Sequence, residues 1–463
     1  MEEVPVYSRE NVIQMFLQDI LKIIEKAKFP VGAVLDRLSE LRINWAIFDE
    51  KSKKNLLHCA AEQGDCESIN RLMYYKIYHI DSYTVIAGGM PCYYALNFAC
   101  ENNHFEAVKL LVQYGANVNA GSYVFEPVLF SAIKSGNMEL FDYLVQCGAN
   151  LNVTDRINRS CLFVATRYGR NDLIDKFINL GQGPWIKNKF GLDLLTAACL
   201  SSNYETLKKI LDKFNCNPYA LDGFNCRPID YLIEEGDREM LALFVSRGIN
   251  ILEPGFLGFS PLSLACRCSN VETASYLLEI GADPNIPNRK DFSYPIEIAV
   301  EKKNLDLVGL LLRNGASVQL QKRAGESLID KAVKADSPEM IELLARYGAD
   351  ISCRSEFSLS SPLHTAAVKA SPAVVSKLIE MGAYVDSLDQ DKMTPLHKAC
   401  ANERPEIVSI LLQKGADINA AGLMGKRPLD LTNNPIIFQM LTQRGATKQS
   451  SWSRCFYMCC SCN

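Results

Sequence analysis

The 463-residue sequence lacks the hydrophobic segments that mark membrane and exported proteins. No window approaches 18 consecutive apolar residues, the minimum expected of a helix that spans a bilayer. The first ten residues, MEEVPVYSRE, are acidic and polar, whereas a secretory signal begins with basic residues followed by an apolar run. These absences predict a cytoplasmic protein.

The sequence also lacks a basic region of the kind that binds nucleic acid. Lysine and arginine total 49 against 53 for aspartate and glutamate, and both signs are mixed along the chain. A nucleic-acid footprint normally shows as clustered Lys and Arg. We therefore expect no nucleic-acid partner.

Nucleotide-binding and hydrolase motifs are absent as well. The sequence contains no G-x-x-x-x-G-K-[ST], no G-x-G-x-x-G, no H-E-x-x-H and no G-x-S-x-G, and it has only five histidines. We therefore expect a protein that is not an enzyme, needs no cofactor and acts on no small-molecule substrate.

What the sequence does contain is a repeat of 33 or 34 residues. The phrase LLVQYGANVNA (110–120) returns as YLVQCGANLNV (143–153), YLLEIGADPNI (276–286) and ILLQKGADINA (410–420). The register of its glycine runs through Gly115, Gly148, Gly181, Asn215, Gly248, Gly281, Gly315, Gly348, Gly382 and Gly415. Such a fixed period indicates a tandem array of structural repeats.

Each repeat reads as two short helices. In the stretch 394–420, Thr394 suits an N-cap and Pro395 suits the first helical turn. Apolar residues then recur at helical spacing in two successive segments, and Gly415 supplies a left-handed C-cap for the second helix. One helix pair cannot bury both of its faces, so neighbouring pairs are expected to stack.

These repeats resemble those of ankyrin-repeat proteins. SPLHTAA (361–367), TPLHKAC (394–400) and NLLHCAA (55–61) match the family's helix-opening motif, and the GAD-N phrases match its loop. The resemblance covers about 12 tandem repeats in residues 55–447. It implies an all-α repeat solenoid of stacked helix-turn-helix units with β-hairpin fingers, which bind one or more proteins on the fingers and the concave face.

Several segments depart from the regular pattern. Residues 1–54 read as a helical N-terminal cap, a divergent first repeat, and residues 448–463 as a flexible cysteine-rich tail. Lys76 and Gly115 are 39 residues apart, so the finger between them is about six residues longer than the others. Asn215 replaces the register glycine of its repeat.

A row of apolar residues runs along the expected finger tips, which usually hold polar turn residues. Three positions before each helix opening stand Val124, Ile157, Phe190, Phe224 and Leu257, and close to the same ridge lie Phe256, Phe259 and Phe292. One interpretation is an elongated hydrophobic site for a protein partner. The alternative is that these side chains pack on the neighbouring fingers.

The resemblance assigns roles to two further sets of polar residues. His58, His364 and His397 occupy the fourth position of the helix-opening motif, where the family's imidazole bridges backbone groups. Acidic residues fill that position in other repeats, which favours hydrogen bonding over catalysis. Asn119 and Asn419 match the loop context in which members of the family undergo asparagine hydroxylation.

The last nine residues contain four of the 17 cysteines, namely Cys455, Cys459, Cys460 and Cys462. Zinc sites usually use two cysteine pairs a dozen or more residues apart, which this spacing does not provide. Stable disulfides are disfavoured in a reducing compartment. Reversible S-palmitoylation fits best, because aromatic neighbours can enter the lipid interface and two or more acyl chains give stable anchoring. The alternative is an unmodified tail.

Two functional hypotheses follow. The first is a non-catalytic scaffold for protein interactions that the acylated tail tethers to the cytoplasmic face of a membrane. The second is a soluble adaptor that recruits a client protein to an enzyme complex such as a ubiquitin ligase. The second would need a docking segment beside the array, and only residues 1–48 are spare.

Overall fold

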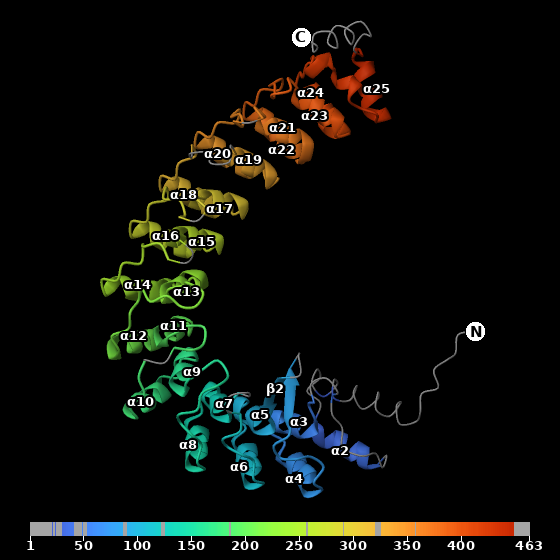
Figure 1. Cartoon of the computed structure of the whole chain (residues 1–463). Coiled ribbons are helices and arrows are strands. Elements are labelled where there is room, and N and C mark those ends of the chain that lie inside the picture. Colours follow the sequence, from blue (N-terminus) through green and yellow to red (C-terminus); the bar gives the residue numbers. More distant parts are fainter. Residues whose placement is uncertain are drawn as a thin grey trace, which may run out of the picture. The chain divides into compact units, whose positions relative to one another are not determined.

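The fold is known from a computed structural model (Figure 1). It describes Leu21, Ile24, Asp49 and residues 30–40, 53–86, 90–121, 126–184, 187–255, 258–289, 291–319, 326–356 and 358–448. The chain divides into two compact units, residues 1–232 with 239–249 and residues 233–238 with 250–463.

Twelve pairs of short helices follow one another along the described chain, which confirms the predicted helical array. The first helices of the pairs are α3 (Leu56–Gln63), α5 (Ala95–Glu101), α7 (Val128–Ser135), α9 (Cys161–Arg167), α11 (Leu194–Cys199), α13 (Pro228–Glu235), α15 (Pro261–Arg267), α17 (Pro295–Glu301), α19 (Leu328–Lys334), α21 (Pro362–Lys369), α23 (Pro395–Ala401) and the short η3 (Pro428–Asp430). The second helices are α4 (Cys66–Tyr74), α6 (Phe105–Gln113), α8 (Met138–Gln146), α10 (Asn171–Asn179), α12 (Tyr204–Lys213), α14 (Arg238–Ser246), α16 (Val271–Glu279), α18 (Leu305–Arg313), α20 (Pro338–Arg346), α22 (Pro372–Glu380), α24 (Pro405–Gln413) and α25 (Pro435–Gln443).

Within each compact unit the first helices pack against one another in chain order. In the first unit the contacts run from α3 through α5, α7 and α9 to α11, and in the second unit from α15 through α17, α19 and α21 to α23. These contacts bury small residues such as Ala60, Ala198 and Ala299, and the second helices bury Leu111 and Leu277. Stacking thus supplies the core that a single pair lacks.

The helix ends are fixed by the residues that the repeat pattern predicted. Gly115 and Gly415 have φ values of +89° and +88°, a left-handed conformation that ends α6 and α24 and that favours glycine. Where Asn215 replaces the glycine, α12 ends differently, because Phe214 takes an extended conformation with φ −129° and ψ 137°. The irregular register in the sequence therefore marks a real change in the chain's path.

The finger turns, which are the segments just before each first helix, are closed by backbone hydrogen bonds. The N–H of Asn188 donates to the Leu192 carbonyl at 3.0 Å, and that of Asp389 donates to Met393 at 3.0 Å. The finger predicted to be longer contains the antiparallel strands β1 (Tyr83–Ile86) and β2 (Met90–Tyr94). Elsewhere in the described chain the fingers are tight turns rather than β-hairpins with named strands.

A further helix, α2 (Val31–Glu40), precedes the array and contacts α3 and α4. The backbone N–H of Gly32 donates to Asp65 Oδ2 at 3.2 Å, and Arg71 pairs with Asp36 at 2.8 Å. These contacts suit a helix that covers the first repeat. The interpretation of residues 1–54 as a cap stays a prediction, because most of that segment lies outside the described residues.

Candidate functional site

The histidines of the helix-opening motif serve as hydrogen-bonding groups. Nδ1 of His364 accepts the Ser361 N–H at 3.1 Å, and Nε2 lies 2.9 Å from the Met393 carbonyl oxygen. Asp330, in the same position of another repeat, accepts the Ser327 N–H at 3.0 Å. Burial lowers the pKa of His364, which favours the neutral imidazole that this arrangement needs. The position is structural, as its mixed occupancy predicted.

Phe190 and Phe224 lie on adjacent finger turns, and their rings stack. The ring centroids are 5.7 Å apart and the planes differ by 25°. The two side chains nevertheless stay 43% and 53% exposed. The packing interpretation therefore holds for this pair, since each ring stacks on its neighbour. Both rings also present an apolar surface to solvent, and the interpretation as a partner site stays a prediction.

Backbone hydrogen bonds between neighbouring turns fix the spacing of these tips. The N–H of Lys189 donates to the Ile157 carbonyl at 2.8 Å, and the N–H of Gly223 donates to the Phe190 carbonyl at 2.7 Å. A Cβ added at Gly223 would lie 2.8 Å from the Phe190 oxygen, so this approach needs glycine. The tip side chains thus sit on a preorganised backbone, which lowers the entropic cost of binding.

The other predicted partner-binding residues occupy different places. Ile157 is half-buried. The Phe259 ring lies 5.0 Å from the Arg267 guanidinium carbon, against the first helix of its repeat. Phe292 is 43% exposed, but its φ of +57° places it at the left-handed position of its turn rather than in the tip row. Outside the described residues lie Val124, Phe256 and Leu257.

A hollow of ≈ 330 Å³ borders the row, and the sequence did not reveal it. Two adjacent finger turns line it, with Arg156 and Asn158 from one turn and Lys187, Asn188 and Lys189 from the next. Arg156 and both lysines are exposed, whereas Asp155 in the same lining is buried and pairs with Arg159 at 2.6 Å. The hollow is therefore positively charged. The sequence did contain a signal for this hollow, because a cationic residue directly precedes an apolar tip residue, as in Arg156-Ile157.

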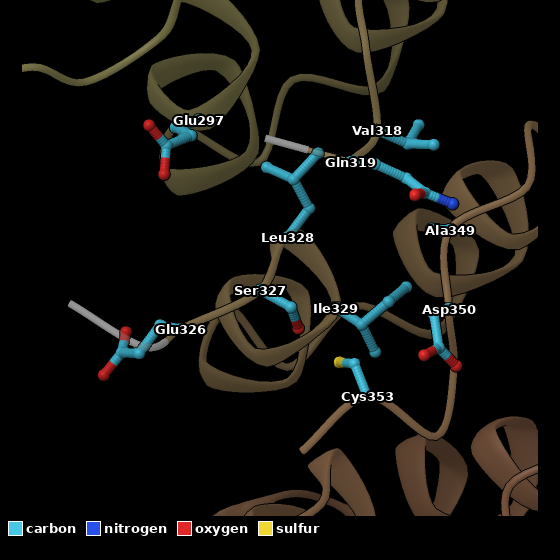
Figure 2. Close-up of a pocket in the computed structure, with 10 residues that line it drawn as sticks. All are labelled: Glu297, Val318, Gln319, Glu326, Ser327, Leu328, Ile329, Ala349, Asp350 and Cys353. Carbon is cyan, nitrogen blue, oxygen red and sulfur yellow. The ribbon is translucent and has the colours of Figure 1, made fainter. Parts of the chain in front are cut away.

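A second hollow, of ≈ 310 Å³, lies in the second compact unit (Figure 2). Figure 2 shows the carboxylates of Glu297, Glu326 and Asp350 well apart around it, without a common point of convergence. Throughout the part of the chain that the structure describes, no group of three or more His, Cys, Asp or Glu side chains could hold a metal ion. This second hollow therefore supports no catalytic or metal-binding assignment.

The asparagines proposed for hydroxylation connect successive repeats. Asn119 Nδ2 donates to the Gly148 carbonyl at 2.9 Å, and its Oδ1 accepts the Asn150 N–H at 2.7 Å. Asn419 Oδ1 likewise accepts the Thr447 N–H at 2.9 Å. Both side chains have a clear structural role, and their hydroxylation stays a prediction.

The cysteines proposed for lipidation, Cys455, Cys459, Cys460 and Cys462, lie outside the described residues. Among the helices that the structure describes, none has both the length and the apolar character needed to cross a membrane.

Comparison with known proteins agrees with the repeat pattern. The family model described as ankyrin repeats matches residues 57–155, 231–323 and 329–422. Ankyrin repeat and SOCS box protein 11 of Mus musculus is 32% identical over 125 residues, which is 27% of this chain and 38% of that protein. The transient receptor potential channel pyrexia of Drosophila melanogaster is 33% identical over 111 residues, which is 24% of this chain and 11% of that protein.

A solved structure, the human ASB11 ankyrin repeat domain, is 29% identical with a TM-score of 0.43 and covers 48% of this chain and 99% of that domain. Of the two full-length relatives, in contrast, the chain spans well under half of the length. The family model, however, covers more than half of the chain, in three blocks that lie within the array of helix pairs. The chain belongs to the ankyrin-repeat family.

Proposed function

We propose that this protein is a non-catalytic scaffold that binds a protein partner on the finger turns before α9, α11 and α13. The observation that carries the proposal is the stacked Phe190–Phe224 pair, which is exposed and held on hydrogen-bonded turns. Aromatic side chains on preorganised backbone are typical anchors of protein interfaces.

The surface of the second helices makes a useful contrast. Its charges pair between successive repeats, as in Lys209–Asp175 at 2.6 Å and Arg247–Asp212 at 2.6 Å. Such pairs add little to stability, and they mix positive and negative charge on this surface. The finger turns offer an apolar surface of the kind that partners cover.

Changing Phe190 and Phe224 together to alanine is expected to weaken partner binding more than folding. Because both rings are about half exposed, the free energy of unfolding should fall by about 1 kcal/mol or less. Loss of two aromatic anchors should weaken the partner complex by about 10- to 100-fold. Urea unfolding measures the first quantity.

Photo-cross-linking in cells tests partner binding even before the partner is identified. Benzoylphenylalanine replaces Phe224, and in a matched control it replaces Tyr204, which is 38% exposed on α12. We expect a protein adduct at position 224, none at 204, and loss of the adduct when Phe190→Ala is added. A loss of several degrees in Tm with an unchanged adduct would instead assign these rings to packing.

We further propose that S-acylation of the tail holds the scaffold at the cytoplasmic face of a membrane. Changing Cys455, Cys459, Cys460 and Cys462 to serine should abolish acyl-exchange labelling and membrane association together. The matched control changes Cys147 and Cys268, two exposed cysteines of the array, and should keep both properties. A wild-type protein that is unlabelled and absent from membranes would contradict the tether.

The alternative is a soluble adaptor that brings a client to an enzyme complex such as a ubiquitin ligase. It is favoured by the similarity to ankyrin repeat and SOCS box protein 11, whose name joins these repeats to a second module. The two proposals differ in one measurement. An adaptor should co-purify with ligase subunits through residues 1–48, whereas a tethered scaffold should lose membrane association with its tail cysteines.

A further inference from the structure

The finger turns before α9, α11 and α13 combine an apolar ridge with exposed positive charge. Lys187 and Lys189 are exposed, and no ion pair is found for either lysine among the described residues. Arg156 lines the same hollow. The ridge itself is formed by the stacked rings of Phe190 and Phe224, which lie on the same and the next turn.

The acidic residues of these turns do not cancel this charge at the surface. Asp155 is buried and pairs with Arg159 at 2.6 Å. Asp222 is also buried and accepts the Phe224 N–H at 2.8 Å as well as the Tyr231 hydroxyl. The remaining carboxylate of the three turns, Asp193, accepts the Thr196 N–H as the N-cap of α11. Each carboxylate is therefore used to build the turns.

The polar side chains in the hollow are similarly used within the fold. Asn158 Nδ2 donates to the Lys187 carbonyl at 3.2 Å and so links the two turns. Asn188 Oδ1 accepts the N–H groups of Phe190 and Leu192, each at 2.9 Å. The ammonium groups of Lys187 and Lys189 are exposed beside these turns, and such groups bind negatively charged ligands.

Three finger turns of the second compact unit lack an apolar residue at the tip. At the position equivalent to Phe190 stand Asp291, Ser358 and Asp391 in three turns of the second compact unit. An acidic or hydroxyl tip would repel or ignore a negatively charged ligand. The charge and the apolar ridge therefore coincide locally, where they can act on one partner.

We infer that the partner segment is an extended acidic peptide in which Asp or Glu side chains face the cationic hollow and an apolar side chain covers the Phe190–Phe224 stack. This inference rests on the proposed function and names the chemistry of its partner. A peptide fits better than a nucleic acid, because three cations on two turns make a short patch rather than a continuous basic stripe, and the whole chain carries a net charge of −4.

Selection from a phage-displayed library of random dodecapeptides on the full chain tests the inference. Enriched peptides should be net negative and should contain aromatic or large aliphatic residues. Their affinity should fall as sodium chloride is raised, because exposed charges are screened. Enrichment of neutral or basic peptides, or no enrichment, would count against the inference, as would displacement of an acidic peptide by oligothymidine at equal concentration.

Charge reversal locates the binding site. Lys187→Glu with Lys189→Glu should weaken a fluorescein-labelled selected peptide by about ten-fold or more. The control, Lys208→Glu with Lys213→Glu, changes two exposed lysines of α12 in the same compact unit and gives the same net charge. It should bind the peptide as wild type does, and equal losses in both variants would overturn the inference.

The cross-linking experiment keeps this inference separate from the proposed function. If position 224 captures a protein in cells while the selected peptides are not acidic, the scaffold function stands and the acidic partner is wrong. If position 224 captures nothing and no acidic peptide is selected, both fail.

Discussion

Replacing Asp230 with alanine is expected to destabilise the fold by about 3–5 kcal/mol. Asp230 and Arg227 form an ion pair at the start of α13 in which the side chains are 3% and 4% exposed. The carboxylate accepts the Arg227 Nη2 at 2.7 Å and also the Arg227 backbone N–H at 2.8 Å. The alanine variant would leave a buried guanidinium without its counter-charge, and that is the costly state.

The chain contains its own control for this prediction, because the motif Arg-Pro-x-Asp occurs twice. Asp430 accepts the Arg427 N–H at 2.9 Å in the last repeat, where Arg427 is only half-buried. Asp430→Ala therefore removes a cap from a hydrated arginine and should cost about 1 kcal/mol. Urea unfolding followed by circular dichroism measures both changes.

A double variant separates the charge from the volume at this site. Arg227→Met with Asp230→Leu removes both charges and keeps an apolar filling, so it should recover much of the loss seen in Asp230→Ala. If Asp230→Ala lowers the free energy of unfolding no more than Asp430→Ala does, burial of the ion pair does not determine its contribution to stability.

The helical array was predictable because each repeat carries its own folding information. Caps such as Thr394, left-handed glycines such as Gly415 and the apolar spacing all lie within one period, and they specify the same helix pair. Repetition then fixes the neighbours, because the partner of each helix face is the next copy of the same pattern. The different end of α12 at Asn215 could be predicted for the same reason, because the register glycine is missing from that repeat.

The finger surface was only partly predictable because it depends on how turns close. Residue spacing placed Ile157, Phe190 and Phe224 in one row, but whether a tip ring packs or stays exposed is decided by its neighbour across the turn-to-turn hydrogen bonds. Phe292 was expected close to the same ridge, and in the structure it occupies the left-handed position of its turn, one residue after the tip position that Asp291 holds.

The electrostatic features needed the structure for a related reason. Arg227 and Arg427 open the same local motif, yet the first is buried and the second half-buried. Likewise, the sequence could not show that Asp155 forms an ion pair with Arg159. The negative charge of Asp155 is therefore not available to neutralise Lys187 and Lys189. Such differences arise from which segment covers a residue, and that information is non-local.

His58 should make the stability of the fold depend on pH between about 6.5 and 4. Burial lowers the pKa of His58 from 6.5 to about 4, because the charged imidazolium would be desolvated; hydrogen bonding to the Ser82 carbonyl opposes this shift, and the nearby charge of Lys54 adds to it. Nδ1 accepts the Asn55 N–H at 3.2 Å, so the neutral ring carries its proton on Nε2, which donates to Ser82 at 3.0 Å.

Protonation at Nδ1 would therefore break the cap as well as bury a charge. Below pH 6.5 the unfolded chain binds a proton that the folded chain does not bind until about pH 4. Stability contributed by the neutral histidine is thus present above pH 6.5 and is lost as pH falls towards 4. The shift corresponds to about 3 kcal/mol over this window.

Urea unfolding at a series of pH values measures this dependence, and the matched variant is His58→Asn. Asparagine fills the same position in the next repeat, where Asn97 Oδ1 accepts the Tyr94 N–H at 3.1 Å, and it does not titrate. The variant should show a pH dependence that is shallower by about 3 kcal/mol, since carboxylates titrate alike in both proteins. His79→Asn, at an exposed position of the same compact unit, should keep the wild-type profile. Equal slopes in wild type and His58→Asn would contradict the prediction. They would show that the folded chain tolerates a charged imidazole at this position, as a hydrated site would allow.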